Sequence, residues 1–190
     1  MKNSLFVLLT FFSLILLGCK KDEDTAPLDY LAGVKDGFIK GTINTQDKDG
    51  KPISLEFDYN FRSDDDVFET SDSTVRVYRE KSFIKGYNGY DYMLFRLKMD
   101  SLGANTVKNV KRVSVSVEKE VSPNKLFRFY ASEDNPTPTG FSVTNLSYDR
   151  NSSTLTGNFS GSFDTDQTNT GKVASISGSF KSHIKTVIND

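Results

Sequence analysis

The sequence has few of the residues that build enzyme active sites and metal centres. Among 190 residues it has one cysteine, one histidine and no tryptophan. The single cysteine, Cys19, excludes an internal disulfide and a zinc site built from several thiolates. The single histidine, His183, has no acidic residue in its immediate neighbourhood and is weak evidence for a catalytic triad. We therefore expect no catalytic residue, no metal ligand and no cofactor, and a protein that is not an enzyme.

An excess of charge of one sign is also missing. Lys and Arg number 24 and Asp and Glu number 25, which gives a net charge of −1. Because no basic stripe is interleaved with aromatic residues, we exclude nucleic acid as a partner. The acidic clusters at residues 47–49, 64–66 and 164–166 are predicted to be solvated loops rather than calcium sites. A hydrolase that uses two carboxylates stays open, since acids are plentiful and their pairing cannot be recognised in sequence, but it is the least favoured function.

The one long apolar run lies at the start of the chain. It extends from Leu5 to Leu17 after the basic start Met1-Lys2. The run is short for a permanent membrane span and has the form of a secretory signal, so residues 1–18 are predicted to be a signal peptide. It ends in Leu16-Leu17-Gly18-Cys19, which resembles the lipobox of bacterial lipoproteins. That resemblance implies cleavage before Cys19, acylation of its thiol and attachment to a membrane through the acyl chains; an ordinary cleaved signal is the alternative.

The residues directly after the cysteine are highly charged. They resemble the export signal of Bacteroidota surface lipoproteins, which implies an outer-membrane protein that faces the cell exterior. The alternatives are a solvated spacer and a protein that faces the periplasm. Residues 19–33 are then a lipidated flexible tether, and residues 34–190 a single domain. The export residues are Lys20, Lys21, Asp22, Glu23 and Asp24.

The domain is predicted to be all-β. Residues 34–190 show no helical period, and short alternating runs are separated by turn residues such as Asp49-Gly50 and Asn88-Gly89. This pattern favours an antiparallel β-sandwich of about eight to ten strands. A flattened lipocalin-like barrel is the alternative. Helix is expected only in the signal peptide and in one turn near Tyr30.

The first hairpin can be predicted in register. A three-residue loop, Lys48-Asp49-Gly50 with a left-handed glycine, keeps the apolar residues of both strands on one face. This loop places Ile43 opposite Leu55, Gly41 opposite Phe57 and Ile39 opposite Tyr59. A two-residue Asp-Gly turn would mismatch the faces.

A second hairpin is predicted at Asn88-Gly89, the strongest short-range hairpin signal. A two-residue turn sets Lys85 opposite Tyr92 and Phe83 opposite Leu94, with the series from Met93 to Met99 facing the core. The other face then gathers aromatic rings around the turn, either as a platform for a glycan or peptide or as rings that support each other. The candidate platform residues are Tyr87, Tyr90, Tyr92 and Lys85.

Two other segments of the middle of the chain carry specific expectations. The strand from Leu126 to Tyr130 is apolar on both faces, which favours a central or covered position. The apolar series from Phe141 to Tyr148 changes face near Asn145, which predicts a β-bulge.

The C-terminal strands alternate glycine with phenylalanine. The segments Gly157-Asn-Phe159-Ser-Gly161-Ser-Phe163 and Ile176-Ser-Gly178-Ser-Phe180 resemble the close of a large group of small Bacteroidota lipoproteins of unknown function. The resemblance implies an all-β fold and a surface location and no activity. A glycine leaves room for a ring from the neighbouring strand, so Phe159 should lie opposite Gly178 and Phe180 opposite Gly157.

Three Asp-Ser/Thr-apolar or similar triplets resemble the O-glycosylation acceptor of Bacteroidota. Their acceptor hydroxyls are those of Thr25, Ser73 and Ser101. All three fall in the predicted tether or in loops, where a transferase has access.

These features favour a non-enzymatic, lipid-anchored surface protein that binds a ligand or serves as an accessory module. Its expected partners are the membrane, through the acyl chains, and a glycan or peptide. The alternatives are a carrier that holds a small apolar ligand inside a barrel and a structural protein of the envelope. The sequence predicts no oligomeric state.

Overall fold

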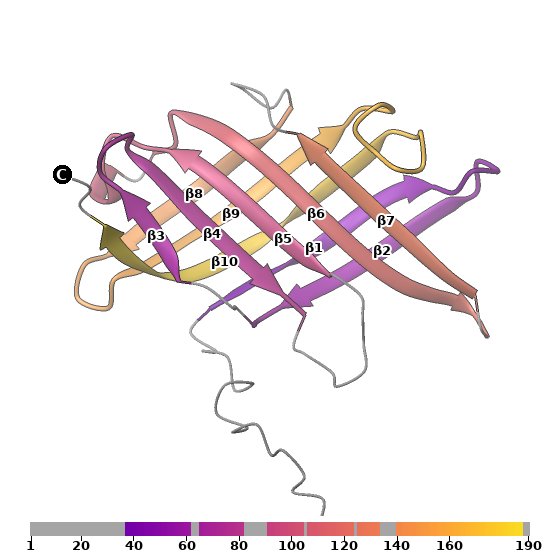
Figure 1. The fold of residues 1–190 in the computed structure, drawn as a ribbon, viewed down its shortest axis with the longest axis horizontal. Helices are drawn as coiled ribbons and strands as arrows, with labels where there is room; N and C mark the ends of the chain where they lie inside the picture. Colours follow the sequence, from indigo (N-terminus) through magenta and orange to yellow (C-terminus); the bar gives the residue numbers. More distant parts are fainter. Residues whose placement is uncertain are drawn as a thin grey trace, which may run out of the picture. The chain divides into compact units, whose positions relative to one another are not determined.

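The computed structural model describes residues 37–61, 65–81, 91–104, 106–123, 125–133 and 140–187. These residues form ten strands and one short 3-10 turn, η1 at Leu102–Ala104 (Figure 1). The predicted signal peptide and tether, the Asn88-Gly89 turn and the turn near Tyr30 lie outside the described residues. The strands are β1 (Phe38–Gln46), β2 (Pro52–Tyr59), β3 (Asp66–Glu69), β4 (Thr74–Glu80), β5 (Tyr92–Lys98), β6 (Asn109–Ser122), β7 (Lys125–Glu133), β8 (Ser142–Asp149), β9 (Thr154–Phe163) and β10 (Ala174–Val187).

The strands form an all-β sandwich, as predicted. One layer contains β2, β1, β10, β9 and β8, and the other contains β3 to β7, whose strands cross those of the first layer (Figure 1). The long strand β10 joins the layers, because it pairs with β1 and β9 over most of its length and then with β3 at its C-terminal end. The sheet order therefore runs β2-β1-β10-β3-β4-β5-β6-β7.

The barrel alternative does not hold, and one finer expectation about the sheet is wrong. The sheet is not closed into a barrel, because β2 and β7 are the ends of the order and do not pair with each other in the described part of the chain. The pairing is also not antiparallel throughout, since β10 and β3 are parallel. The reason is topological: after Tyr59 the chain enters the second layer, and β3 pairs with the end of β10 running in the same direction.

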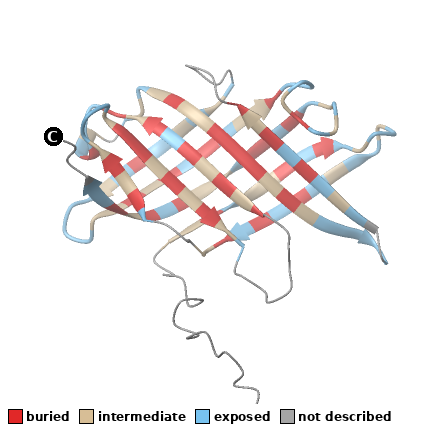
Figure 2. Ribbon diagram, viewed as in Figure 1, coloured by how far each residue is buried: buried red, intermediate tan, exposed pale blue. Residues whose placement is uncertain are grey.

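The core lies between the two layers. Along most strands buried residues alternate with residues that reach the surface, as Figure 2 shows. This period of two follows from the pleat, which sends successive side chains to opposite faces. The inward series from Met93 to Met99 is fully buried, as predicted. The largest buried apolar side chains include Phe95, Phe129, Phe163, Phe180, Ile39, Ile43 and Leu55.

The predicted register of the first hairpin is confirmed. Ile43 lies opposite Leu55, Gly41 opposite Phe57 and Ile39 opposite Tyr59. Gly50 has a φ of 82°, the left-handed conformation that the three-residue loop requires. The Asp47 carboxylate also accepts the backbone N–H groups of Asp49 at 3.0 Å and Lys51 at 2.8 Å, so this side chain stabilises the turn.

The predicted pairing of rings with glycines is also confirmed. Phe159 lies opposite Gly178, and Phe180 lies opposite Gly157. A Cβ atom at Gly178 would lie 2.6 Å from the Phe159 ring and would overlap the backbone carbonyl of Lys40 in β1. Glycine is therefore required here by the ring on one side and by the close approach of a neighbouring strand on the other.

The prediction for the second hairpin is wrong in its pairing. Leu94 lies opposite Tyr78 rather than Phe83, and Tyr92 lies opposite Glu80 rather than Lys85. The partner of β5 is thus β4, which alternates apolar and polar residues as regularly as the segment chosen from the turn signal. The longer connection between these strands lies largely outside the described residues.

The expectations for the other two segments have different outcomes. The bulge near Asn145 is confirmed, because the register of β8 against β9 shifts between Thr144 and Ser147, and Asn145 has a φ of 51°. The strand from Leu126 to Tyr130 is not central: β7 is the last strand of the sheet order, and Leu126 and Tyr130 are 52% and 43% exposed. The strand is nevertheless covered along its outer edge, because the loop before β10 hydrogen-bonds to it through Gln167 and Asn169.

Among the described residues no helix has the length and apolar character needed to cross a membrane.

Candidate functional site

Most of the predicted site residues fall outside the described residues. These are Cys19, Lys20, Lys21, Asp22, Glu23, Asp24, Thr25, Lys85, Tyr87 and Tyr90. Two predicted acceptor hydroxyls are described and lie between strands: Ser73 in the turn before β4 and Ser101 directly before η1. Tyr92, the remaining residue of the predicted platform, is the first residue of β5.

The structure places two other tyrosines around Tyr92. Tyr78 of β4, Tyr92 of β5 and Tyr130 of β7 lie on the outer face of the second layer, and we call them the tyrosine strip. The rings of Tyr78 and Tyr92 have centroids 5.9 Å apart and are inclined by 35°. Ser116 of β6 lies between Tyr92 and Tyr130 in register, and its small side chain lets these two side chains meet across it.

The hydroxyl groups of the strip are tied to their neighbours. Tyr78 donates a hydrogen bond to the Glu80 carboxylate at 3.2 Å. Burial raises the pKa of Tyr78 above its ordinary value, and the Glu80 charge raises it further. Burial also raises the pKa of Tyr92, followed by its interaction with Tyr130, while Arg112 lowers it. The phenols of Tyr78 and Tyr92 are therefore neutral at physiological pH and available as hydrogen-bond donors and acceptors.

Three arginines lie side by side next to the tyrosine strip. Arg76 of β4 is opposite Arg96 of β5, which is opposite Arg112 of β6, and we call them the arginine row. The Arg76 guanidinium lies 5.8 Å from the centroid of the Tyr78 ring, so the row and the strip are in contact. Like charges directly opposite each other destabilise a sheet. The row places three guanidinium groups side by side on the outer face.

The middle arginine is the most accessible of the three. Arg96 is exposed, whereas Arg76 and Arg112 are half-buried. The Nε atom of Arg112 donates to Ser114 Oγ at 3.3 Å, which orients that side chain along the strand. In the part of the chain that the structure describes, Arg96 has neither a hydrogen bond nor an ion pair.

Sequence reasoning missed Tyr78, Tyr130 and the arginine row. The alternation in Thr74–Glu80 contains the signal for Tyr78, because Val75 and Val77 face the core and so send Arg76 and Tyr78 to the other face. The alignment of the arginines depends on the pairing of β4 with β5, which the Asn88-Gly89 turn obscured.

A second polar cluster is fully buried and serves the fold. The carboxylate of Asp66 is paired with the Arg79 guanidinium and accepts a hydrogen bond from the Ser182 hydroxyl, and both Asp66 and Arg79 are 0% exposed. The backbone N–H of Tyr78 donates to the same carboxylate at 2.8 Å. Asp66 was predicted to lie in a solvated loop, which is wrong: it starts β3 and faces the core. The cluster ties β3, β4 and β10 together where the two layers join.

The other chemically active side chains are dispersed. His183 in β10 is half-buried, and its Nδ1 donates to the Ser152 carbonyl oxygen at 2.9 Å. The described residues contain no group of three or more His, Cys, Asp or Glu side chains that is placed to hold a metal ion. The tyrosine strip with the arginine row is therefore the candidate site on the outer face.

No family model, no curated protein and no solved structure matches this chain.

Proposed function

We propose that this protein is a lipid-anchored module of the cell surface that binds a glycan on the outer face of β4 to β7. The tyrosine strip is the observation that carries the proposal. Aromatic rings on a sheet face provide stacking surfaces for sugar rings, and neutral phenols supply hydrogen bonds to sugar hydroxyls. Tyr130 is the most exposed ring of the strip, at 43%.

The arginine row supports an acidic glycan in particular. Guanidinium groups bind carboxylates and sulfates through paired hydrogen bonds, and they do so in a fixed planar geometry. An acidic sugar seated over Arg96 would also relieve the repulsion among the three arginines. Stacking on tyrosines and charge pairing with the row would then act on successive units of one polysaccharide.

The lipid anchor and the surface location rest on the sequence. The lipobox ending in Cys19 supplies the anchor, and Lys20, Lys21, Asp22, Glu23 and Asp24 supply the export signal. A random coil of the length of the predicted tether, residues 19–33, spans roughly 20 Å, which is enough to lift a small domain above lipid headgroups. Such an anchor and tether would place the proposed glycan-binding face at the cell surface.

An array of acidic and neutral polysaccharides, probed with the full chain, tests the proposal. We expect binding to acidic polysaccharides that weakens as salt is added, because exposed charges are screened. The double change Tyr92→Ala and Tyr130→Ala should abolish binding. Phe38→Ala is the matched control, because it removes an aromatic ring from the other layer. The centroid of that ring lies 4.9 Å from Lys40 Nζ.

Two results would contradict the proposal. Binding that survives the double tyrosine change would remove the strip as the site. A protein that retains peptides from a peptide array and no polysaccharide would replace the glycan with a peptide as the ligand.

A further inference from the structure

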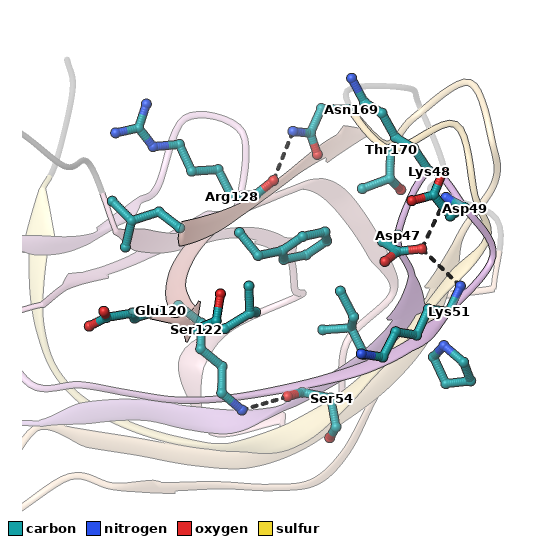
Figure 3. Close-up of a pocket in the computed structure, with 16 residues that line it drawn as sticks. Asp47, Lys48, Asp49, Lys51, Ser54, Glu120, Ser122, Arg128, Asn169 and Thr170 are labelled. Carbon is teal, nitrogen blue, oxygen red and sulfur yellow. Dashed lines mark hydrogen bonds between the residues drawn. The ribbon is translucent and has the colours of Figure 1, made fainter. Parts of the chain in front are cut away.

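A groove opens at one end of the sandwich, between the two layers, and Asn169 in its lining accepts the backbone N–H of Tyr130. It lies between the β1–β2 turn, the end of the β6–β7 hairpin and the loop that precedes β10, and its volume is about 740 Å³ (Figure 3). Volumes of this order hold small-molecule ligands in other proteins. The groove forms because β2 and β7, the two ends of the sheet order, part here instead of pairing.

The floor of the groove continues the apolar core. Ile53 alternates with the buried Leu55 along β2, and Phe127 alternates with the buried Phe129 along β7, so both face the space between the layers. Ile53 and Phe127 are partly buried and pack against the core. Val121 also lines the groove and is 44% exposed. Apolar surface is thus left in contact with water at this end of the sandwich.

Two of the charged side chains that face inward in the groove are lysines, and the third is Asp47, which continues the inward series of Ile43 and Thr45 beyond β1. Lys119 lies directly opposite Phe127 in the β6–β7 register and shares its inward face. Its ammonium group donates to the Ser54 carbonyl oxygen at 2.9 Å and so reaches from one layer to the other (Figure 3). Lys51 precedes Ile53 by two residues, and Figure 3 shows its side chain directed into the groove.

The acidic side chains that line the groove are those of Asp47, Asp49 and Glu120. Asp47 uses its carboxylate to hold the turn, through the N–H groups of Asp49 and Lys51. Asp49 is exposed in that turn, and Glu120 has the opposite strand parity to Lys119. An ammonium has three N–H donors, and that of Lys119 spends one on Ser54. The inward side of the groove therefore combines apolar surface with two ammonium groups, which have spare donors, against one carboxylate.

We propose that this groove binds a small amphiphile with an anionic head and an apolar body. The head pairs with the ammonium groups of Lys51 and Lys119, and the body covers Ile53, Val121 and Phe127. Charge-assisted hydrogen bonds to a carboxylate or sulfate are stronger than neutral ones, which fixes the orientation of the ligand. The groove uses other side chains than the tyrosine strip, so the variants that test the two proposals differ and either proposal can fail without the other.

Methyl NMR with octanoate as the probe tests the proposal. The full chain carries Cys19→Ser, so that no attached acyl chain competes for the groove. We expect saturable shifts in the methyl groups of Ile53, Val121 and Leu126, which line the groove, and none in those of Val75, which is buried away from it. Octyltrimethylammonium should bind at least about tenfold more weakly than octanoate, because its head is cationic rather than anionic.

Two variants separate the charge from the apolar surface. Lys51→Gln with Lys119→Gln should weaken octanoate binding about tenfold, while Ile53→Thr should weaken octanoate and octanol alike. Lys185→Gln, on β10 and outside the groove, is the control and should change nothing. Equal binding of the anionic and cationic probes, full binding to the double lysine variant, or no saturable shift at millimolar octanoate would each overturn the proposal.

Discussion

At the scale of single residues, the most consequential contact is the buried pair of Asp66 and Arg79. Neither side chain is exposed, and Ser182 and the backbone of Tyr78 complete the surroundings of the carboxylate. Taking two charges out of water is expensive, so the pair adds less stability than its geometry suggests. Removing one partner alone is far worse, because the other charge stays buried without compensation.

We therefore expect Arg79→Met to lower the free energy of unfolding by about 3–5 kcal/mol. The adjacent pair of Lys185 and Asp65 is largely exposed and provides the comparison. Lys185→Met should cost no more than about 1 kcal/mol. Urea denaturation of the two variants measures both values, and similar losses would show that burial is not what makes the Arg79 pair matter.

The tyrosine strip has its own signature in alkaline solution. Burial and the Glu80 charge raise the pKa of Tyr78, so its phenol stays protonated at a pH where an unfolded chain has ionised it. The unfolded state then binds fewer protons than the folded state, and stability falls as the pH rises above the ordinary tyrosine value of 10.0. Stability is fully present below that pH.

Tyr78→Phe should remove this part of the alkaline loss and leave stability at neutral pH nearly unchanged. An ultraviolet titration of the folded protein should show some phenols that ionise above the ordinary tyrosine pKa, and the variant should show fewer of them. Thermal unfolding at neutral pH and at alkaline pH completes the measurement. An identical alkaline loss in the variant would assign it to other groups.

At the scale of elements, predictability depends on how many independent signals act on a strand pair. The β1–β2 register was predictable because the loop geometry and the apolar alternation select the same alignment, and the same holds for Phe159 and Phe180 opposite their glycines. The partner of β5 was not predictable. The Asn88-Gly89 turn and the alternation in β4 favour different partners, and the sequence does not rank them.

Pairings between segments far apart in the chain cannot be predicted from local sequence patterns. The parallel contact of β10 with β3 joins residues more than a hundred positions apart, and the arginine row exists only because three strands align. The tyrosine strip is an intermediate case. Its residue Tyr78 could be assigned to a face from alternation, but not to a neighbour.

The arginine row makes a prediction about the strands themselves. Arg96 lies between Arg76 and Arg112, and like charges opposite each other on a sheet are destabilising. Arg96→Gln should therefore raise the free energy of unfolding by about 0.5 kcal/mol at low ionic strength. The gain should shrink as salt screens the charges. Denaturation at low and high salt tests this, and Lys108→Gln, whose partner is the oppositely charged Asp100, should show no gain.

At the scale of the whole molecule, the proposed anchor can be tested independently of the domain. Cys19→Ser should prevent acylation and release the protein from the membrane, because the acyl chains on Cys19 are the proposed attachment. Changing Lys21, Asp22 and Glu23 to Ala should leave the protein acylated but facing the periplasm. Protease treatment of intact cells, with membrane fractionation, distinguishes the two results. Unchanged surface exposure of the triple variant would reject the assignment of these residues as an export signal, without affecting the assignment of the lipobox.

The position of β10 in both layers has a consequence for the synthesis of the protein. This strand follows the other nine along the chain, yet it pairs with β1, β9 and β3. A partial chain leaving a ribosome therefore contains two groups of strands and lacks the one that joins them. Loops this long close slowly, since their entropy is lost before their contacts form. The hairpins of consecutive strands can form earlier, and we expect the two layers to be joined only after this last strand has been synthesised.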